Sequence, residues 1–380
     1  MTLYQLALLG SPSEQLQTSI TECIKRAIEE LGMTLGKEVT LHVGNSPFEH
    51  IEKLSAGALY FGAAPGAALP GLDGLLRKRI PIIPVASEPD RFAAEIPSQL
   101  RATNGVFLVN SNAERLTTIL LEAVGLLPKQ RRIFLSYKRD ESRDVALQLF
   151  EALSGRLFDV FLDTHGIAEG ASFQEALWHK LCDCDVVVML DTPNYFSSRW
   201  TRGEFGRALV KSLVVLRVGW PGVAIDRRAQ LARDLSLENS DFAPGNLLLT
   251  QDAISKIALE LESARTTSIA TRYRNLVGSV SEGLEKIGGA VTGIGMGRRM
   301  NLRFPDGTTA AAFPAIGVPT SAIMQDAMGE HDDEVAIVFD HFGVKLDWLQ
   351  HMEWLENNIK RVRWVRGTDA PWVFADWEPK

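Results

Sequence analysis

The sequence predicts an α/β protein of several domains, built on parallel sheets that helices cover on both faces. Its 380 residues suffice for two or three domains of the usual ~100–200 residues. Short apolar runs alternate with segments of helical spacing over the first two thirds of the chain, as in parallel sheets. A hydrophobic content of 46% and a charged content of 23% exclude disordered, collagen-like and coiled-coil classes.

The first block, residues 1–127, alternates strand and helix patterns and is predicted to be an α/β domain. Strands are predicted at residues 4–9, 39–43, 58–61, 80–85 and 106–109, and helices at 15–31 and 113–124. Pro81 and Pro84 interrupt the fourth strand. Because proline cannot donate a ladder hydrogen bond, this strand is predicted to lie at a sheet edge.

The second block, residues 130–266, repeats this alternation after a boundary at residues 126–130. Strands are predicted at residues 132–137, 157–163, 185–190, 213–218 and 246–249, and helices at 142–153, 172–182, 198–211, 226–235 and 251–264. The run Val186–Leu190 is apolar on both faces, which is typical of a central parallel strand. The block is therefore predicted to form a five-stranded parallel sheet.

The third block, residues 270–380, is less regular, and its pattern fits either an α+β or an α/β domain. Helices are predicted at residues 271–286 and 347–359, and strands at 336–339 and 362–365. The run Gly293–Gly297 precedes Arg298 and Arg299 and has two interpretations. A flexible loop is favoured over a phosphate cradle, because the run lacks the GxGxxG spacing and a clear preceding strand.

Charge and apolar patterning limit the partners and the location. The net charge is −7, whereas nucleic-acid binders usually carry clustered Lys and Arg, so direct nucleic-acid binding is not expected. No apolar run approaches the ~18 residues of a membrane span, and the first residues do not resemble a signal peptide. We therefore expect a cytoplasmic protein without membrane contact.

The cysteines and histidines predict neither disulfides nor a metal. The three cysteines cannot build a disulfide framework and suggest a reducing compartment. Cys182 and Cys184 have no second cysteine pair, and His165 and His179 are not spaced as partner ligands. No metal site is expected.

Four segments of the second block carry a pattern in a fixed order. They are Ile133–Arg139, Val160–Asp163 followed by Ile167–Gly170, Cys184–Leu190, and Asn194–Trp200 followed by Glu204. In this order and spacing they resemble a TIR (Toll/interleukin-1 receptor) domain of the bacterial NAD+-cleaving type, over about a third of the chain. The resemblance implies a flavodoxin-like fold for residues 130–266. The first block lacks the SYKR-like loop and the Trp/Glu helix, so it is expected to be a TIR-like domain without catalysis.

Glu204 is the candidate catalytic residue. The nicotinamide of NAD+ leaves as a neutral pyridine, so no general acid is required. One carboxylate near the ribose can stabilise the oxocarbenium-like charge. Trp200 lies four residues earlier and would share a helix face with Glu204. The resemblance assigns the same roles, with Glu204 as the catalytic glutamate and Trp200 as the tryptophan before it.

The resemblance also implies substrate contacts elsewhere in the block. Phe173 matches an aromatic residue on the nicotinamide side, and Lys138 and Arg139 match a basic pair in the loop after the first strand, which Tyr137 opens. Two cations at the carboxyl end of a parallel strand suit a phosphate. Lys138 stands where some relatives have arginine, which keeps the charge without the bidentate fork.

Each of these residues also has a purely structural interpretation. Glu204 could complete a capping box with Thr201, and Trp200 could anchor a core or an interface. Phe173 could be a core residue, and Lys138 and Arg139 could belong to a solvated loop.

The sequence therefore predicts an NAD+ glycohydrolase that yields nicotinamide and ADP-ribose or a cyclic ADP-ribose. NAD+ is the substrate, and no cofactor is expected. The resemblance implies activity in a homo-oligomer or filament, in which the BB loop at residues 164–171, with Ile167, Glu169 and Gly170, completes a neighbour's site. It also implies anti-phage defence. The flanking domains, 1–127 and 270–380, would receive an activating ligand or partner protein.

Two alternatives stay open. The domain could be a non-catalytic TIR interaction module, although such a module has no need of the Trp200 and Glu204 pair. It could also be an N-glycosidase acting on another nucleotide or on a nucleoside, which would use the same carboxylate chemistry.

Overall fold

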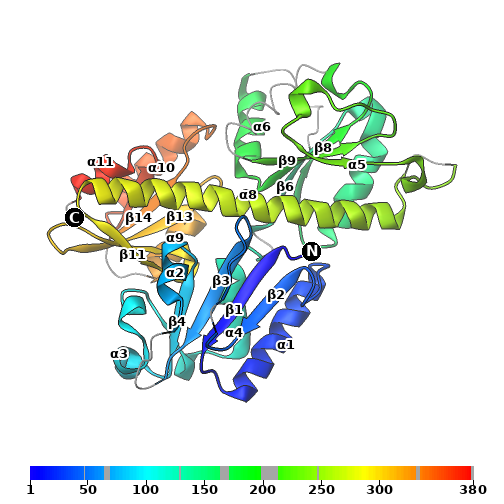
Figure 1. The fold of residues 1–380 in the computed structure, drawn as a ribbon. Coiled ribbons are helices and arrows are strands. Elements are labelled where there is room, and N and C mark those ends of the chain that lie inside the picture. Colours follow the sequence, from blue (N-terminus) through cyan, green and yellow to red (C-terminus); the bar gives the residue numbers. More distant parts are fainter. Residues whose placement is uncertain are drawn as a thin grey trace. The chain divides into compact units, whose positions relative to one another are not determined.

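The computed structural model describes residues 1–46, 48–63, 69–127, 130–162, 171–197, 213–245, 248–330 and 334–377, with the side chains of 171–176 and 330 not described (Figure 1). Within these residues, fifteen strands form three five-stranded sheets. The chain divides into two compact units. One contains Met1–Leu127, Tyr273–His341 and Asp347–Lys380, and the other Pro128–Arg272 and Phe342–Leu346. The multidomain α/β class is confirmed.

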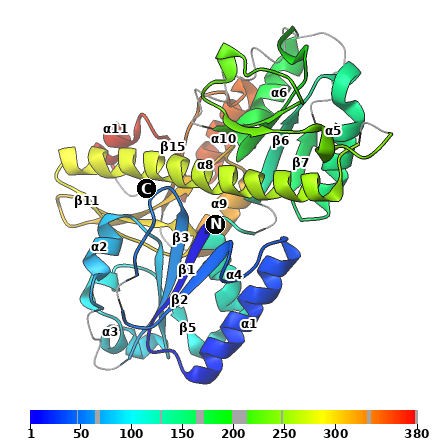
Figure 2. The ribbon, with the colours of Figure 1, turned by 45° about the vertical axis from the view of Figure 1, so that its right-hand side comes forward.

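The N-terminal sheet is parallel, in the order β2-β1-β3-β4-β5. Its elements are β1 (Tyr4–Gly10), α1 (Glu14–Glu30), β2 (Val39–Val43), β3 (Ser55–Phe61), α2 (Leu72–Arg77), β4 (Ile82–Ala86), α3 (Phe92–Glu95), β5 (Val106–Phe107) and α4 (Ala113–Ala123). Short 3-10 helices lie at Pro89–Arg91, Ser98–Leu100 and Leu108–Asn110. Helices α1 and α4 pack together on one face, and α2 packs on the other (Figure 2).

The prediction that β4 is an edge strand is wrong, because β4 lies between β3 and β5. The reason is the shortness of β5, which pairs only with Val85 and Ala86 of β4. Pro84 lies outside that pairing, so the missing N–H costs no ladder bond on the outer side. The predicted strand at 106–109 is also shorter than expected, since a 3-10 helix begins at Leu108.

The middle sheet is also parallel, in the order β10-β9-β8-β6-β7. Its elements are β6 (Arg132–Ser136), α5 (Arg139–Ser154), β7 (Asp159–Leu162), α6 (Ala171–Asp183), β8 (Val186–Asp191), β9 (Val214–Gly219) and β10 (Arg233–Ser236), with 3-10 helices at Tyr195–Ser197, Arg227–Ala229 and Asn239–Asp241. Helix α5 covers one face and α6 the other. The predicted sheet with helices on both faces is confirmed.

Two predictions at the end of this domain are wrong. The fifth strand of the sheet is β10, whereas Leu249 forms only an isolated bridge with Phe242, and no long helix spans 226–235. The overlooked signal is an alternation in which Leu235 and Leu237 are buried while Asp234 and Ser236 are exposed, which is the period of a strand. Residues 246–247 and the helix predicted at 198–211 lie outside the described residues.

Helix α8 (Gln251–Lys286) replaces the two helices predicted at 251–264 and 271–286. Its first part contributes Ile257 and Leu261 to the core of the middle domain, and its last part contributes Val277 and Val280 to the C-terminal core. The predicted break is absent because the residues between the two segments include no glycine or proline.

The C-terminal sheet is mixed, in the order β11-β12-β13-β14-β15. Its elements are β11 (Ala290–Ile294), β12 (Met300–Arg303), β13 (Thr309–Ala315), α9 (Ser321–Glu330), β14 (Val335–Phe339), α10 (Leu346–Asn358), β15 (Val362–Arg366) and α11 (Ala370–Ala375), with a 3-10 helix at Met296–Arg298. The β11–β12 and β12–β13 pairs are antiparallel, whereas β13–β14 and β14–β15 are parallel. The sheet therefore combines antiparallel pairs, as in an α+β domain, with parallel pairs, as in an α/β domain.

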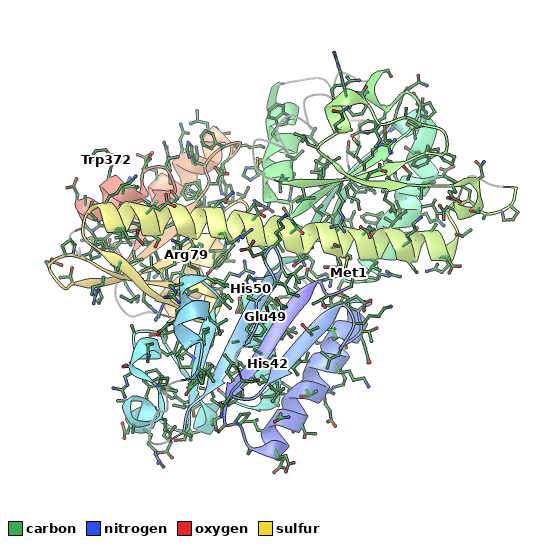
Figure 3. All side chains as sticks on the ribbon, viewed as in Figure 1. Met1, His42, Glu49, His50, Arg79 and Trp372 are labelled. Carbon is green, nitrogen blue, oxygen red and sulfur yellow. The ribbon has the colours of Figure 1, made fainter. Side chains whose placement is uncertain are left out.

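Two tryptophans of this domain differ in their environment. Trp348 donates a hydrogen bond to the Pro319 carbonyl, whereas Trp372 on α11 is 78% exposed (Figure 3).

Candidate functional site

The candidate site lies at the carboxyl edge of the middle sheet, where β6 and β8 end side by side. Ser136 ends β6 and pairs in register with Met189 of β8, which ends at Asp191. Open parallel sheets bind ligands at this edge, because the loops after neighbouring strands bring their side chains together there. The Ser136 Oγ and the Tyr195 hydroxyl, both buried, are 2.7 Å apart and share a hydrogen bond across the two loops.

A charged and polar cluster joins the start of α5 to the loop after β8. The Glu141 carboxylate accepts a hydrogen bond from the Asn194 backbone N–H at 3.1 Å and another from Asn194 Nδ2 at 2.8 Å. Lys138 Nζ lies 3.1 Å from Glu141 Oε1 and donates to Ser197 Oγ at 3.3 Å. The Ser197 hydroxyl in turn donates to the Asn194 carbonyl at 2.6 Å. The cluster thus fixes residues 194–197 against α5.

Glu141 is held in its charged form. Burial alone raises the pKa of its carboxyl, but polar contacts from Thr192, Asn194 and Lys138 outweigh burial and lower the pKa to about 2. The side chain is 20% exposed, so these contacts are only partly screened by water. At neutral pH Glu141 therefore stays an anion that anchors Lys138 and Asn194.

A second network, centred on a buried arginine, lies beside this cluster. Arg217 on β9 is fully buried and forms ion pairs with Asp191 at the end of β8 and with Asp234 on β10. Its third nitrogen donates to the Val223 carbonyl at 2.9 Å. Burial raises the pKa of the Asp191 carboxyl more than its pairing with Arg217 lowers it. Arg217 thus ties three neighbouring strand ends together.

The predicted cations differ in their surroundings. Lys138 is half-buried and engaged with Glu141 and Ser197, whereas Arg139 is exposed. The Tyr137 side chain is 4% exposed and belongs to the core beneath α5. Their contacts with substrate stay predictions.

Other predicted site residues lie outside the described part of the chain. Trp200 and Glu204 fall there, as do the BB-loop residues Ile167, Glu169 and Gly170. Phe173 belongs to α6, but its side chain is not described.

Glu141, Asn194 and Arg217 were not singled out from the sequence. Glu141 follows Lys138 by three residues, the spacing of an ion pair on one helix face. Arg217 interrupts the apolar strand Val214–Gly219, and a charge at such a position requires buried partners. The spacing of Lys138 and Glu141 and the charge of Arg217 within an apolar run can both be seen in the sequence. Neither feature predicts which residue of another segment each side chain contacts.

The described residues hold no cluster of His, Cys, Asp or Glu that could ligate a metal ion. Cys182 and Cys184 are both buried, and burial raises the pKa of the Cys184 thiol well above its usual value. A metal ligand must be a thiolate, which burial disfavours. Among the helices described here, none combines the length and the apolar character that crossing a bilayer requires.

Comparison with known proteins assigns the middle domain to a family. The family model described as TIR domain matches residues 133–245, whereas no match was found among curated proteins. Among solved structures, Clostridium botulinum CMP N-glycosidase BcmB has 12% identity and a TM-score of 0.25, covering 34% of this chain and 98% of its own.

Two further structures cover more of the chain. Escherichia coli tagatose-6-phosphate ketose/aldose isomerase has 11% identity and a TM-score of 0.21, covering 70% of this chain and 82% of its own. The leucine binding protein LivK of Thermotoga maritima has 11% identity and a TM-score of 0.18, covering 82% and 97%. TM-scores this low do not establish a shared fold. The family match identifies residues 133–245 of this chain as a TIR domain, and the parallel sheet of the middle domain is consistent with it.

Proposed function

We propose that the TIR domain cleaves the bond between nicotinamide and ribose in NAD+. The observation that carries this proposal is the pair Trp200 and Glu204, which lies within the matched range 133–245. Cleavage breaks the C–N bond, and the bonding electrons leave with nicotinamide as a neutral base. Water then attacks the ribosyl cation and releases a proton, giving ADP-ribose, or an internal nucleophile closes a cyclic ADP-ribose.

The described cluster supports this proposal by its place in the chain. Ser197, which Lys138 and Asn194 hold, immediately precedes the segment that contains Trp200 and Glu204. The residue that precedes that segment is therefore anchored at the carboxyl edge of the sheet, where parallel sheets bind ligands. A carboxylate preorganised near the ribose would stabilise the positive charge that develops there.

The other residues take supporting roles in the proposed reaction. Arg139, exposed beside the β6 end, would contact the pyrophosphate, because its planar fork suits phosphate oxygens. Lys138, which Glu141 holds in place, would also contact the phosphates of the substrate. Tyr137 would support the loop from the core, and Trp200 and Phe173 would flank the nicotinamide.

Assembly and biology extend the same proposal. A neighbouring copy would complete the site with its BB loop, so that activity depends on a homo-oligomer or filament. The protein would act in the cytoplasm as a defence effector that depletes NAD+ or makes a nucleotide signal during phage infection. Following cellular NAD+ after infection, with and without Glu204→Gln, would test that role.

The central experiment measures nicotinamide release from NAD+ by the purified full chain at several protein concentrations. We expect release to rise more than linearly with concentration, and Glu204→Gln to lower the rate by at least about 10²-fold, the cost of removing a group that stabilises transition-state charge. The matched control is Glu151→Gln, an exposed glutamate on α5. It should leave the rate unchanged.

The outcomes separate the alternatives. Cleavage of CMP or of nucleosides with NAD+ left intact would favour an N-glycosidase of different substrate. An equal rate in the wild type and Glu204→Gln would contradict the role of Glu204. Self-association without cleavage of any of these substrates, and unchanged in Glu204→Gln, would favour the interaction module.

A further inference from the structure

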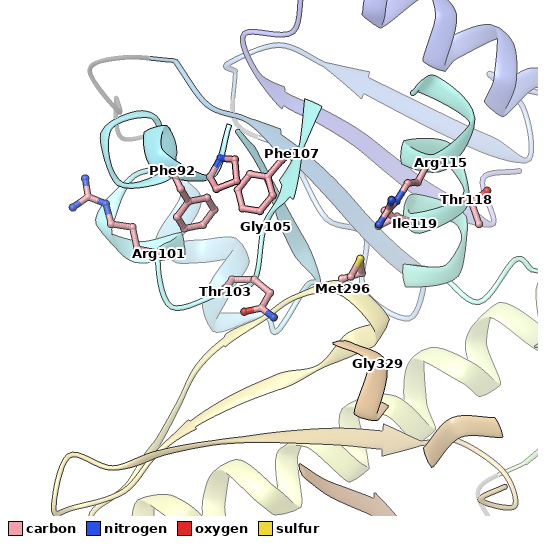
Figure 4. Close-up of a pocket in the computed structure, with 12 residues that line it drawn as sticks. Phe92, Arg101, Thr103, Gly105, Phe107, Arg115, Thr118, Ile119, Met296 and Gly329 are labelled. Carbon is pink, nitrogen blue, oxygen red and sulfur yellow. The ribbon is translucent and has the colours of Figure 1, made fainter. Parts of the chain in front are cut away.

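A cavity of about 880 Å³ lies at the outer edge of the N-terminal sheet, in the unit that also contains the C-terminal sheet (Figure 4). Its walls come from the connection between β4 and β5, from α4, from the turn between β11 and β12 and from the end of α9. The lining residues are Pro89, Phe92, Arg101, Thr103, Asn104, Gly105, Phe107, Arg115, Thr118, Ile119, Met296 and Gly329. Its volume is in the range of small-molecule sites, ~300–1,000 Å³.

The cavity combines aromatic walls with positive charge. The rings of Phe92 and Phe107 meet edge to face, with centroids 6.1 Å apart. Figure 4 shows Arg101 and Arg115 on opposite sides of these rings. Among the described side chains that line it, none carries a carboxylate. The lining therefore favours a ligand that has a flat apolar ring and negative charge.

The two arginines keep hydrogen-bond donors for such a ligand. Arg101 Nε donates to the Ile96 carbonyl at 2.8 Å, and Arg115 Nη1 makes a long contact of 3.4 Å with the Asn110 carbonyl. Neither forms an ion pair with any residue in the described ranges. A guanidinium without a carboxylate partner is suited to phosphate oxygens, which it can bind through two nitrogens at once.

Thr103 adds a buried polar atom on the wall. Its side chain is 2% exposed, and its hydroxyl has no hydrogen-bond partner among the residues that the structure describes. The hydroxyl lies at the close approach of Gly293, so it belongs to the contact between Thr103 and β11 and does not face the open space of the cavity.

The glycine-rich run explains how this wall is built. A Cβ on Gly293 would lie 2.6 Å from Thr103 Oγ1, and one on Gly295 would lie 2.6 Å from Thr103 Cγ2. Only glycine lets β11 and its turn approach so closely, and Met296 in the same turn lines the cavity. Of the run Gly293–Gly297, for which a flexible loop was predicted, Gly293 and Ile294 instead belong to the paired strand β11.

We propose that this cavity binds a nucleotide, with the base against Phe92 and Phe107 and the phosphate on Arg115. The site is separate from the proposed NAD+ site, because all its lining residues belong to the other unit. It would give the flanking domains a small-molecule ligand.

Calorimetric titration of the full chain with AMP tests the proposal, with adenosine and ribose 5-phosphate as the separate halves of the probe. We expect AMP to bind more tightly than either half. Arg115→Ala should weaken AMP binding at least about tenfold, since a hydrogen bond to a charged group is lost. Phe107→Leu, which keeps an apolar side chain, should weaken it at least about fivefold through lost stacking.

Two control variants test whether AMP binds in this cavity and not elsewhere on the protein. Lys25→Ala, which removes an exposed cation from α1, should leave the affinity unchanged. Glu204→Gln should also leave it unchanged, so that a failure of the proposed NAD+ cleavage does not decide this test. AMP bound as tightly by Arg115→Ala and Phe107→Leu as by the wild type would place it elsewhere and overturn the proposal. No binding by the wild type at millimolar AMP would also overturn it.

Discussion

The N-terminal and middle domains share one sheet topology and differ in what they place at its carboxyl edge. When the strands of each domain are numbered in chain order, both sheets run 2-1-3-4-5, the flavodoxin-like order. In the middle domain, side chains from different segments are bonded to one another at this edge: Glu141 accepts a hydrogen bond from Asn194, and Arg217 forms an ion pair with Asp191. Such a network can hold catalytic segments in place.

In the N-terminal domain, β1 and β3 approach each other through their backbones at this edge. Gly10 ends β1 with φ +83°, and the Phe61 carbonyl lies so near that a Cβ on Gly10 would be 2.0 Å from its oxygen. Its cavity lies instead at the outer edge, beside β5, and is lined by aromatic rings and arginines. The comparison teaches that one fold can carry different chemistry, because loops and strand ends supply the functional groups.

The largest effect is expected where the middle domain depends on buried charge. Arg217→Met leaves Asp191 buried without its cation, and removing one partner of a buried pair costs roughly 3–5 kcal/mol. Hydrogen exchange in β8 and β9 of the full chain should accelerate accordingly, while exchange in the N-terminal sheet should not change. The double variant Arg217→Met with Asp191→Leu should recover part of the loss. Unchanged exchange in the single variant would show that the network does not stabilise the sheet.

The next effect tests the close approach of the β1 and β3 backbones in the N-terminal domain. Gly10→Ala places a Cβ against the Phe61 carbonyl in a left-handed conformation, which costs about 1–2 kcal/mol before the clash is added. Hydrogen exchange in β1 and β3 should rise, and exchange in β6 and β8 should stay as it is. Gly74→Ala in α2 is the control, since a Cβ there meets nothing within 4 Å. Equal behaviour of the two variants would argue against a close approach at Gly10.

A smaller effect is expected at Glu141. Glu141→Gln keeps the shape but loses charged hydrogen bonds, so it should destabilise the middle domain by about 1–3 kcal/mol at pH 7. The folded pKa of about 2 is below the ordinary value of 4.5, so the charge stabilises the fold above pH 4.5 and this contribution is lost as the pH falls towards 2.

Thermal unfolding at pH 7 and at acidic pH checks this dependence. The difference between the wild type and Glu141→Gln should shrink below pH 4.5, because protonation makes Glu141 resemble glutamine. Glu151→Gln on the same helix should match the wild type at both pH values, since Glu151 is exposed. A difference that is independent of pH would mean that the charge of Glu141 is not what holds Asn194.

Many of the helices and strands could be predicted, because they depend on the pattern of apolar residues within a short segment. The runs at Tyr4–Gly10 and Val186–Asp191 are strands because only the interior of a sheet accommodates so many consecutive apolar side chains. Strand β10 was missed because Arg233 and Asp234 resemble a helix surface, and its pairing with β9 supplies the missing stability. The candidate site was predictable only where the TIR motifs name it.

The sequence by itself determined the α/β class, the position of the TIR domain and the place of Lys138 and Arg139 directly after its first strand, although Arg139 begins helix α5 and does not lie in the predicted loop. Those features follow from apolar periodicity and from motifs of neighbouring residues. Only the tertiary structure decided that Glu141 meets Asn194, 53 residues away, and that Met296 faces a cavity with Phe92 and Arg115. Contacts between distant segments depend on how strands are ordered in a sheet, and no local pattern records that order.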